Sequence, residues 1–200
     1  MMPEIKDYKD FQKYWNEFFN LCNINIYTKK SIIKIIEKEK SGKGEIYLEF
    51  KNLNDKNFVI EILTSAKNNS CCINKKKNCD GILLNINVKN KNMNIYLIEL
   101  KTTLTSKIEE ANEQIRNAYW FISSFNLFKC FDVHCEVILA YRNFNKTNLL
   151  NMRKNIDIRN TFKNTLYSFD ETSKFPIMLP FCKYIELNVE LLEFNTKKVV

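Results

Sequence analysis

Residues 79–103, CDGILLNINVKNKNMNIYLIELKTT, decide the fold, because two apolar runs there are separated by a short polar segment. The runs, residues 82–88 and 93–100, are rich in Ile, Leu and Val, and residues 89–92 are the turn-prone Lys-Asn-Lys-Asn. Two such runs with a short polar connection are typical of a β-hairpin. We therefore expect two adjacent antiparallel strands at the centre of the domain.

Three ionisable residues lie at one end of this hairpin. Asp80 precedes the first strand, and Glu99 and Lys101 lie at the end of the second. Side chains two positions apart on a strand share a face, and an antiparallel turn brings Asp80 back beside Glu99. Two close carboxylates repel each other unless a hard divalent cation lies between them. The spacing thus predicts a metal site, while solvated strand ends with an ordinary ion pair remain the alternative.

The whole pattern resembles the PD-(D/E)xK nuclease superfamily: an Asp before one strand, an apolar hairpin, Ile-Glu-Leu-Lys, and two threonines leading into a helix. The residue before Asp80 is Cys79, where the family pattern has proline. The resemblance is closest to RecB-like or small archaeal and viral nucleases. It implies that Asp80, Glu99 and the backbone carbonyl of Leu100 bind Mg²⁺ or Mn²⁺. It also implies that Lys101 acts in catalysis.

The fold implied by the resemblance is α/β (α+β), a restriction-endonuclease-like core with a central mixed sheet flanked by helices. We expect a single domain in 200 residues, which is long enough for one sizeable core. Its parts are an N-terminal helical segment (1–30), the core (31–142) and a C-terminal extension (143–200). The expected elements are a helix at 8–22, a hairpin of 45–50 with 58–63, a strand at 131–141, a basic helical region at 147–169, a loop bracketed by Pro176 and Pro180, and a strand at 184–194.

An additional metal ligand is expected on a helix that precedes the hairpins. Residues 31–40 are predicted to form this helix, with Ser31 as N-cap and a Gly-containing stop after it. In the superfamily the first core helix often supplies a further acidic residue to the metal. Glu37 is the nearest candidate by position, and Glu39 is almost as good. Pairing of Glu37 with a neighbouring lysine is the alternative.

The helix after the central hairpin provides another candidate. Ser106 and Glu109 have the spacing of a capping box, and an apolar stripe follows them to residue 125. On its flank, Gln114 resembles the glutamine of the Q-x3-Y motif of RecB-like members, where it would orient Lys101 or a phosphate. Tyr119 falls one residue late for that motif and is interpreted as a packing residue.

Charge favours a polyanionic partner, because 31 Lys and Arg stand against 23 Asp and Glu, giving a formal charge of +8. A lysine- and asparagine-rich bias of an A·T-rich genome would give the same balance. Lys75, Lys76 and Lys77 form a basic loop before the predicted site and are candidate nucleic-acid contacts, or simply solvated. We expect a nucleic-acid partner, DNA before RNA, and a homodimer is a further expectation.

Seven cysteines, an odd number, argue against a disulfide framework, and no export signal is expected. Cys71, Cys72 and Cys79 could hold zinc or an iron–sulfur cluster, as in some RecB-like nucleases, although a C-x2-C pair is missing. No apolar run is long enough for a membrane span, so no membrane partner and a cytoplasmic location are expected.

Competing catalytic sites are excluded by composition. His134 is the only histidine, and three glycines cannot supply a phosphate-binding loop motif. The expected function is therefore a metal-dependent nuclease, a hydrolase acting on phosphodiester bonds. The alternative is a catalytically inactive nucleic-acid-binding or protein-interaction module on the same fold.

Overall fold

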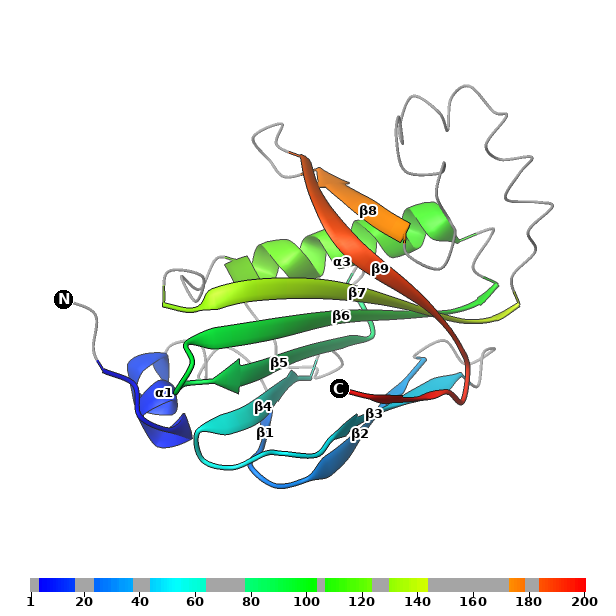
Figure 1. The fold of residues 1–200 in the computed structure, drawn as a ribbon. Helices are drawn as coiled ribbons and strands as arrows, with labels where there is room; N and C mark the ends of the chain where they lie inside the picture. Colours follow the sequence, from blue (N-terminus) through cyan, green and yellow to red (C-terminus); the bar gives the residue numbers. More distant parts are fainter. Residues whose placement is uncertain are drawn as a thin grey trace.

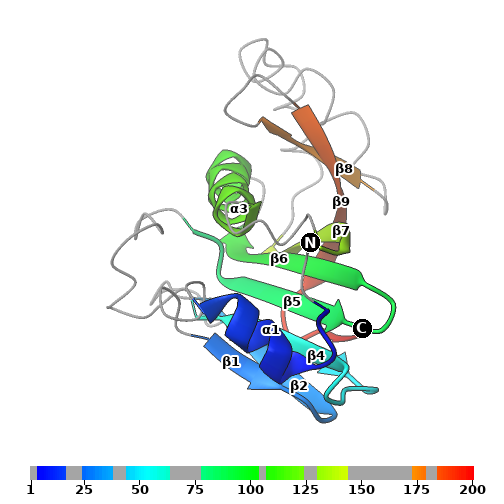
Figure 2. The same ribbon diagram turned by 90° about the vertical axis from the view of Figure 1, so that its left-hand side faces the viewer.

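The computed structural model describes residues 4–16, 24–37, 44–63, 78–103, 107–123, 130–143, 173–178 and 184–200. This part is a mixed α+β fold that consists mostly of sheet. Its two helices, α1 (Tyr8–Tyr14) and α3 (Ile108–Ser123), pack on one face of a seven-stranded sheet (Figures 1 and 2). A three-stranded sheet covers the other face. Neither described helix is long and apolar enough to cross a membrane.

The seven-stranded sheet is mixed, because β6 to β7 and β7 to β9 pair in parallel and the other neighbours pair in antiparallel fashion. The smaller sheet is also mixed, with β10 parallel to β3 and β2 antiparallel to it. The strands of the larger sheet, in spatial order, are β1 (Ile24–Tyr27), β4 (Asn57–Ile62), β5 (Gly81–Asn87), β6 (Asn92–Thr103), β7 (Asp132–Asn143), β9 (Tyr184–Glu193) and β8 (Ser173–Met178). Those of the smaller sheet are β10 (Lys197–Val199), β3 (Glu45–Phe50) and β2 (Ser31–Ile36).

The central hairpin is confirmed as β5 and β6, in antiparallel register from Gly81 opposite Ile98 to Asn87 opposite Asn92. Alternate residues of β6 face opposite layers: Leu97 packs on the helical side and Ile98 on the side of the small sheet. The predicted apolar stripe of α3 is confirmed over its described side chains, which are fully buried against the large sheet: Ala111, Ile115, Ala118 and Ile122.

The helix predicted for residues 31–40 is wrong over its described part, where residues 31–36 form strand β2. Ile33 and Ile35 are buried in the core, whereas Ile32 and Ile36 are both 54% exposed, which is the alternation of a one-sided strand. β-Branched isoleucines also favour a strand, and the antiparallel pairing with β3 satisfies the backbone.

Strands were correctly predicted near residues 45–50 and 58–63, but they do not form a hairpin with each other. β3 belongs to the outer sheet, where Ile46 and Leu48 face the core and Glu49 lies on the opposite side of the strand. In β4, Phe58 and Val59 are both fully buried although they point to opposite faces. A strand that is apolar on both faces belongs in a covered central sheet, so β4 pairs with β5.

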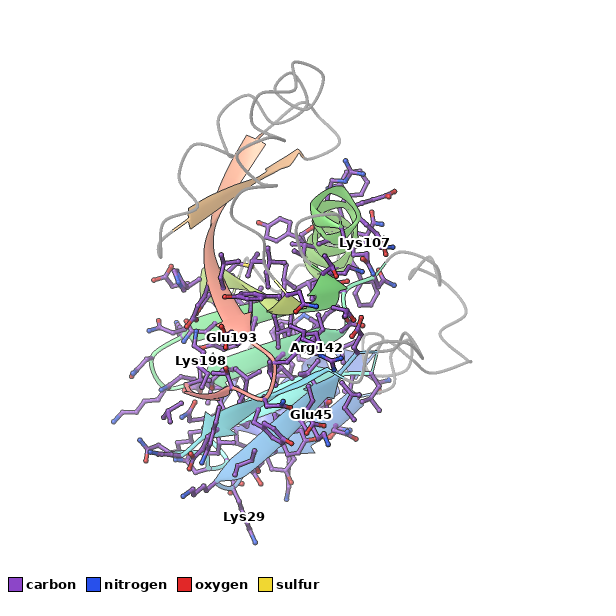
Figure 3. The ribbon with its side chains drawn as sticks, turned by 90° about the vertical axis from the view of Figure 1, so that its right-hand side faces the viewer. Lys29, Glu45, Lys107, Arg142, Glu193 and Lys198 are labelled. Carbon is purple, nitrogen blue, oxygen red and sulfur yellow. The ribbon has the colours of Figure 1, made fainter. Side chains whose placement is uncertain are left out.

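The C-terminal part adds strands to both sheets. β9 extends the large sheet beyond β7, and Pro176, predicted to border a loop, lies in the edge strand β8, where a missing N–H is tolerated. On β10, Lys198, which is labelled in Figure 3, forms ion pairs with Glu136 of β7 and Glu190 of β9. These pairs join the small sheet to the large one.

Other predictions fall partly or wholly outside the described residues. The N-terminal helix is confirmed as α1, which ends at Tyr14 with Trp15 as its C-cap, and residues 17–22 of the predicted helix are outside the described part. The basic helical region 147–169, the capping residue Ser106, Cys71, Cys72 and the lysines at 75–77 are outside it as well.

Candidate active site

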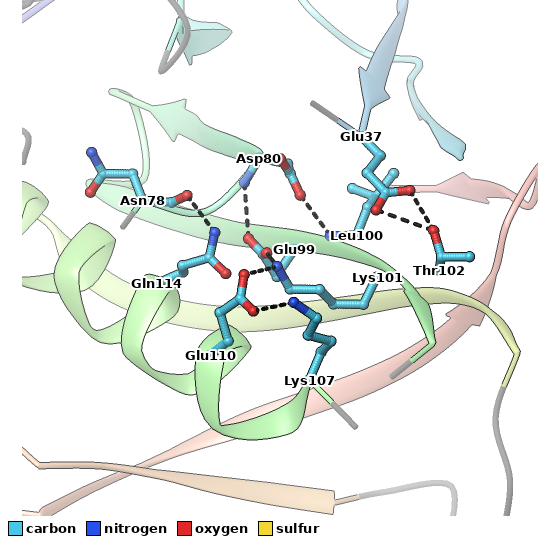
Figure 4. Close-up of polar contacts among 10 residues, drawn as sticks. All are labelled: Glu37, Asn78, Asp80, Glu99, Leu100, Lys101, Thr102, Lys107, Glu110 and Gln114. Carbon is cyan, nitrogen blue, oxygen red and sulfur yellow. Dashed lines mark hydrogen bonds and ion pairs between the residues drawn. The ribbon is translucent and has the colours of Figure 1, made fainter. Parts of the chain in front are cut away.

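Asp80 and Glu99 meet where β6 extends past the start of β5. Gly81, the first residue of β5, pairs with Ile98, so the next residues of β6 have no partner in β5. The segment before β5 takes that place: the Asp80 N–H donates to Glu99 Oε2 at 3.2 Å, and the Leu100 N–H donates to Asp80 Oδ2 at 2.9 Å (Figure 4). The hairpin thus brings the two predicted acidic residues together.

Lys101 lies beside Glu99 on the face of β6 that is covered by α3. The Lys101 Nζ is 2.7 Å from Glu99 Oε1, and the Lys101 side chain is 6% exposed while that of Glu99 is 0% exposed. The same ammonium is 3.0 Å from Oε1 of Glu110 on α3, whose Oε2 is 2.9 Å from the Lys107 Nζ. Four charges of alternating sign therefore run from the buried strand to the surface of the helix (Figure 4).

The four neighbouring charges stabilise one another in their ionised forms. Burial is the largest influence on the Lys101 pKa and lowers it, but attraction and hydrogen bonding to Glu99 and Glu110 outweigh burial, so the pKa is raised above 10.5. The hydrogen bond from Lys107, assisted by Lys101, lowers the pKa of Glu110 below 4.5 despite partial burial. Lys101 and Glu110 are therefore both charged at neutral pH.

Glu37 reaches the same part of β6 from the opposite face. It follows β2 directly, is largely buried, and its carboxylate accepts a hydrogen bond from Thr102 Oγ1 at 3.1 Å. Its own N–H donates to the Gly44 carbonyl, which fixes the chain at this point. Glu37 is thus close to the predicted site, but it comes from the end of a strand and not from a helix.

Gln114 lies one helical turn after Glu110. Its Nε2 donates to the Asn78 carbonyl at 3.1 Å, so it holds the backbone that leads into Asp80. Its buried Oε1 accepts no hydrogen bond from the residues that the structure describes. The contact that the structure shows is therefore with the backbone of Asn78, and the role of Gln114 in orienting Lys101 or a phosphate stays a prediction.

The donor set at this edge suits a hard cation. A strand residue directs its N–H and C=O to the same side, so the Leu100 carbonyl faces the edge at which Asp80 lies. Carboxylate and carbonyl oxygens are the ligands that Mg²⁺ and Mn²⁺ accept, and Mg²⁺ usually keeps several waters. Within the described ranges, no cluster of three or more His, Cys, Asp or Glu side chains could hold a metal ion. Binding of a cation by Asp80, Glu99 and the Leu100 carbonyl stays a prediction.

The predicted cysteine metal site stays a prediction, because Cys71 and Cys72 are outside the described residues. Cys79 is a buried thiol outside any disulfide, and its Sγ donates to the Gly81 carbonyl at 3.2 Å. This contact gives it a packing role beneath the site.

Neither Glu110 nor Lys107 was predicted from the sequence as a site residue. The helical spacing of Glu110 and Gln114, four positions apart, places both on one face of α3 and was the available signal. No family model, no curated protein and no solved structure matches the chain.

Proposed function

We propose that the protein is a metal-dependent nuclease with a restriction-endonuclease-like core, which hydrolyses phosphodiester bonds in nucleic acid, DNA in preference to RNA. The observation that carries the proposal is the position of Glu99. Its fully buried carboxylate accepts the Asp80 N–H and lies 2.7 Å from the Lys101 ammonium. Asp80, Glu99 and Lys101 converge at one end of β6. A buried charge there would cost free energy of folding if it had no partner.

In this proposal Asp80, Glu99 and the Leu100 carbonyl hold Mg²⁺ or Mn²⁺. The bound ion supplies Lewis acidity, polarising the phosphate and lowering the pKa of the attacking water. Lys101 orients that water or offsets the charge that develops on the phosphate. Asp80 keeps its place through the Leu100 N–H, and Gln114 holds the preceding backbone at Asn78. The formal charge of +8 favours a polyanionic substrate.

A binding module without catalysis is the second candidate. It is favoured by the tight pairing of Lys101 with both Glu99 and Glu110, which satisfies these charges without a metal. Such a pairing would also be suitable for a purely structural ion network.

The deciding experiment measures nicking and cleavage of supercoiled, linear, branched and single-stranded DNA, and of RNA, in Mn²⁺, Mg²⁺ and EDTA. Wild-type protein should cleave with the metals and not with EDTA, and Lys101→Met should lose cleavage while remaining folded by circular dichroism. Lys34→Met is the matched control, because Lys34 also pairs with a glutamate, Glu45, but on the small sheet. Cleavage by Lys101→Met at the wild-type rate would refute the assignment, and DNA retardation without any cleavage would favour the binding module.

A further inference from the structure

Glu110 occupies a position that the proposed chemistry leaves unexplained. Its carboxylate contacts two lysines at once, Lys101 at 3.0 Å through Oε1 and Lys107 at 2.9 Å through Oε2 (Figure 4). The side chain is 40% exposed, whereas Lys101 is almost completely buried. Glu110 therefore links the buried Lys101 to the exposed surface of α3.

The buried ammonium of Lys101 needs a negative partner in every state of the site. Among the described residues, Glu99 and Glu110 are the carboxylates that pair with it. When Glu99 binds a divalent cation, its negative charge is shared with that cation and its attraction for Lys101 falls. Glu110 is then the carboxylate that still compensates Lys101.

We propose that Glu110 is a positioning residue, which keeps the Lys101 ammonium at the reaction site while Glu99 is engaged by the metal. This inference rests on the proposed nuclease function. Lys107 fixes the second oxygen of Glu110, so the carboxylate presents Oε1 to the strand.

The surroundings of Glu110 make it suitable for this task. It precedes Ala111, which is fully buried against the large sheet, so the helix backbone at this point is fixed by packing. One turn later Gln114 binds the Asn78 carbonyl, two residues before Asp80. One face of α3 thus holds both Lys101 and the segment that carries Asp80.

The test is a double-mutant cycle on Mn²⁺ binding to the full chain, measured by isothermal titration calorimetry. Glu110→Gln should weaken Mn²⁺ binding about 10- to 100-fold. Without the Glu110 carboxylate, Lys101 pairs with Glu99 alone, and Mn²⁺ must compete with Lys101 for the Glu99 carboxylate. In a Lys101→Met background the same substitution should change the affinity by less than about twofold, since its effect acts through Lys101. Glu45→Gln, which removes a lysine-paired glutamate on the small sheet, should leave the affinity unchanged.

An equal loss of affinity in both backgrounds would overturn the inference, because Glu110 would then act only as a nearby negative charge. If wild-type protein binds no Mn²⁺, the proposed function fails together with this inference. If wild-type protein binds Mn²⁺ and cleaves DNA but the cycle shows no coupling, only the role of Glu110 fails.

A kinetic measurement covers the case in which the double variant does not fold. At saturating Mn²⁺, Glu110→Gln should have the wild-type KM and a lower kcat. The metal site is then fully occupied again, but the Lys101 ammonium is still not held in position. Glu110→Asp, which keeps the charge, should recover part of the kcat. Full recovery of kcat in Glu110→Gln at saturating Mn²⁺ would contradict a positioning role.

Discussion

Replacing Lys101 by Met should destabilise the metal-free protein, because Glu99 would keep a charge in a place that solvent does not reach. The Glu99 carboxylate lies 2.7 Å from the Lys101 ammonium and is 0% exposed. Removing one partner of a buried pair costs about 3–5 kcal/mol, and we expect about 3 kcal/mol here because the Asp80 N–H still donates to Glu99. For a chain of this size each kcal/mol lowers Tm by roughly 2–4 °C, which gives a fall of about 6–12 °C.

The assay is equilibrium unfolding in urea with EDTA present, followed by circular dichroism. A domain of ordinary stability, about 5–15 kcal/mol, remains folded after such a loss. Adding Glu99→Gln to Lys101→Met should restore most of the stability, because the amide still accepts the Asp80 N–H and no longer carries a charge. Equal urea midpoints for wild-type and Lys101→Met, or no recovery in the double variant, would show that the buried pair does not act as described.

Two further predictions concern the small sheet. Gly44→Ala should destabilise the protein by about 1–3 kcal/mol in urea unfolding, because a Cβ there would lie 2.1 Å from the Phe194 ring, and a wild-type midpoint would contradict this close packing. Hydrogen bonds from Lys197 and Lys30 lower the pKa of Glu49 from 4.5 to about 2. The stability that Glu49 contributes is complete above about pH 4.5 and is lost as the pH falls towards 2, so the difference in urea midpoint between wild-type and Glu49→Gln should shrink over that range. A constant difference would exclude this linkage.

The centre of the fold and the core of the candidate site could be predicted because both depend on local patterns. The β5–β6 hairpin follows from two apolar runs and a polar turn, and antiparallel pairing then places Asp80 at Glu99. The facing of Lys101 and Glu99 to one side follows from the two-residue period of a strand. These features required no knowledge of how the layers pack.

The features that were missed depend on packing between distant segments. The run Ser-Ile-Ile-Lys-Ile-Ile of β2 fits a helical or a strand period over so short a length, and only its pairing with β3 decides. The position of Glu110 beside Lys101 is set by the packing of α3 on the large sheet, which the sequence spacing does not specify. The same reason explains why β3 and β4, neighbours in the sequence, belong to different sheets.

The parallel pairing of β10 with β3 joins two segments that lie far apart in the sequence. Residue 197 lies beside residue 47, so this contact closes one of the longest loops in the described structure, whereas β2 and β3 can pair from neighbouring parts of the chain. Contacts between residues far apart in sequence form slowly, because the entropy of loop closure must be overcome first. During synthesis β3 leaves the ribosome long before β10, so its β10-facing edge stays open to other strands. Pairing of β10, together with the ion pairs of Lys198, therefore ends the period in which this edge is open to aggregation.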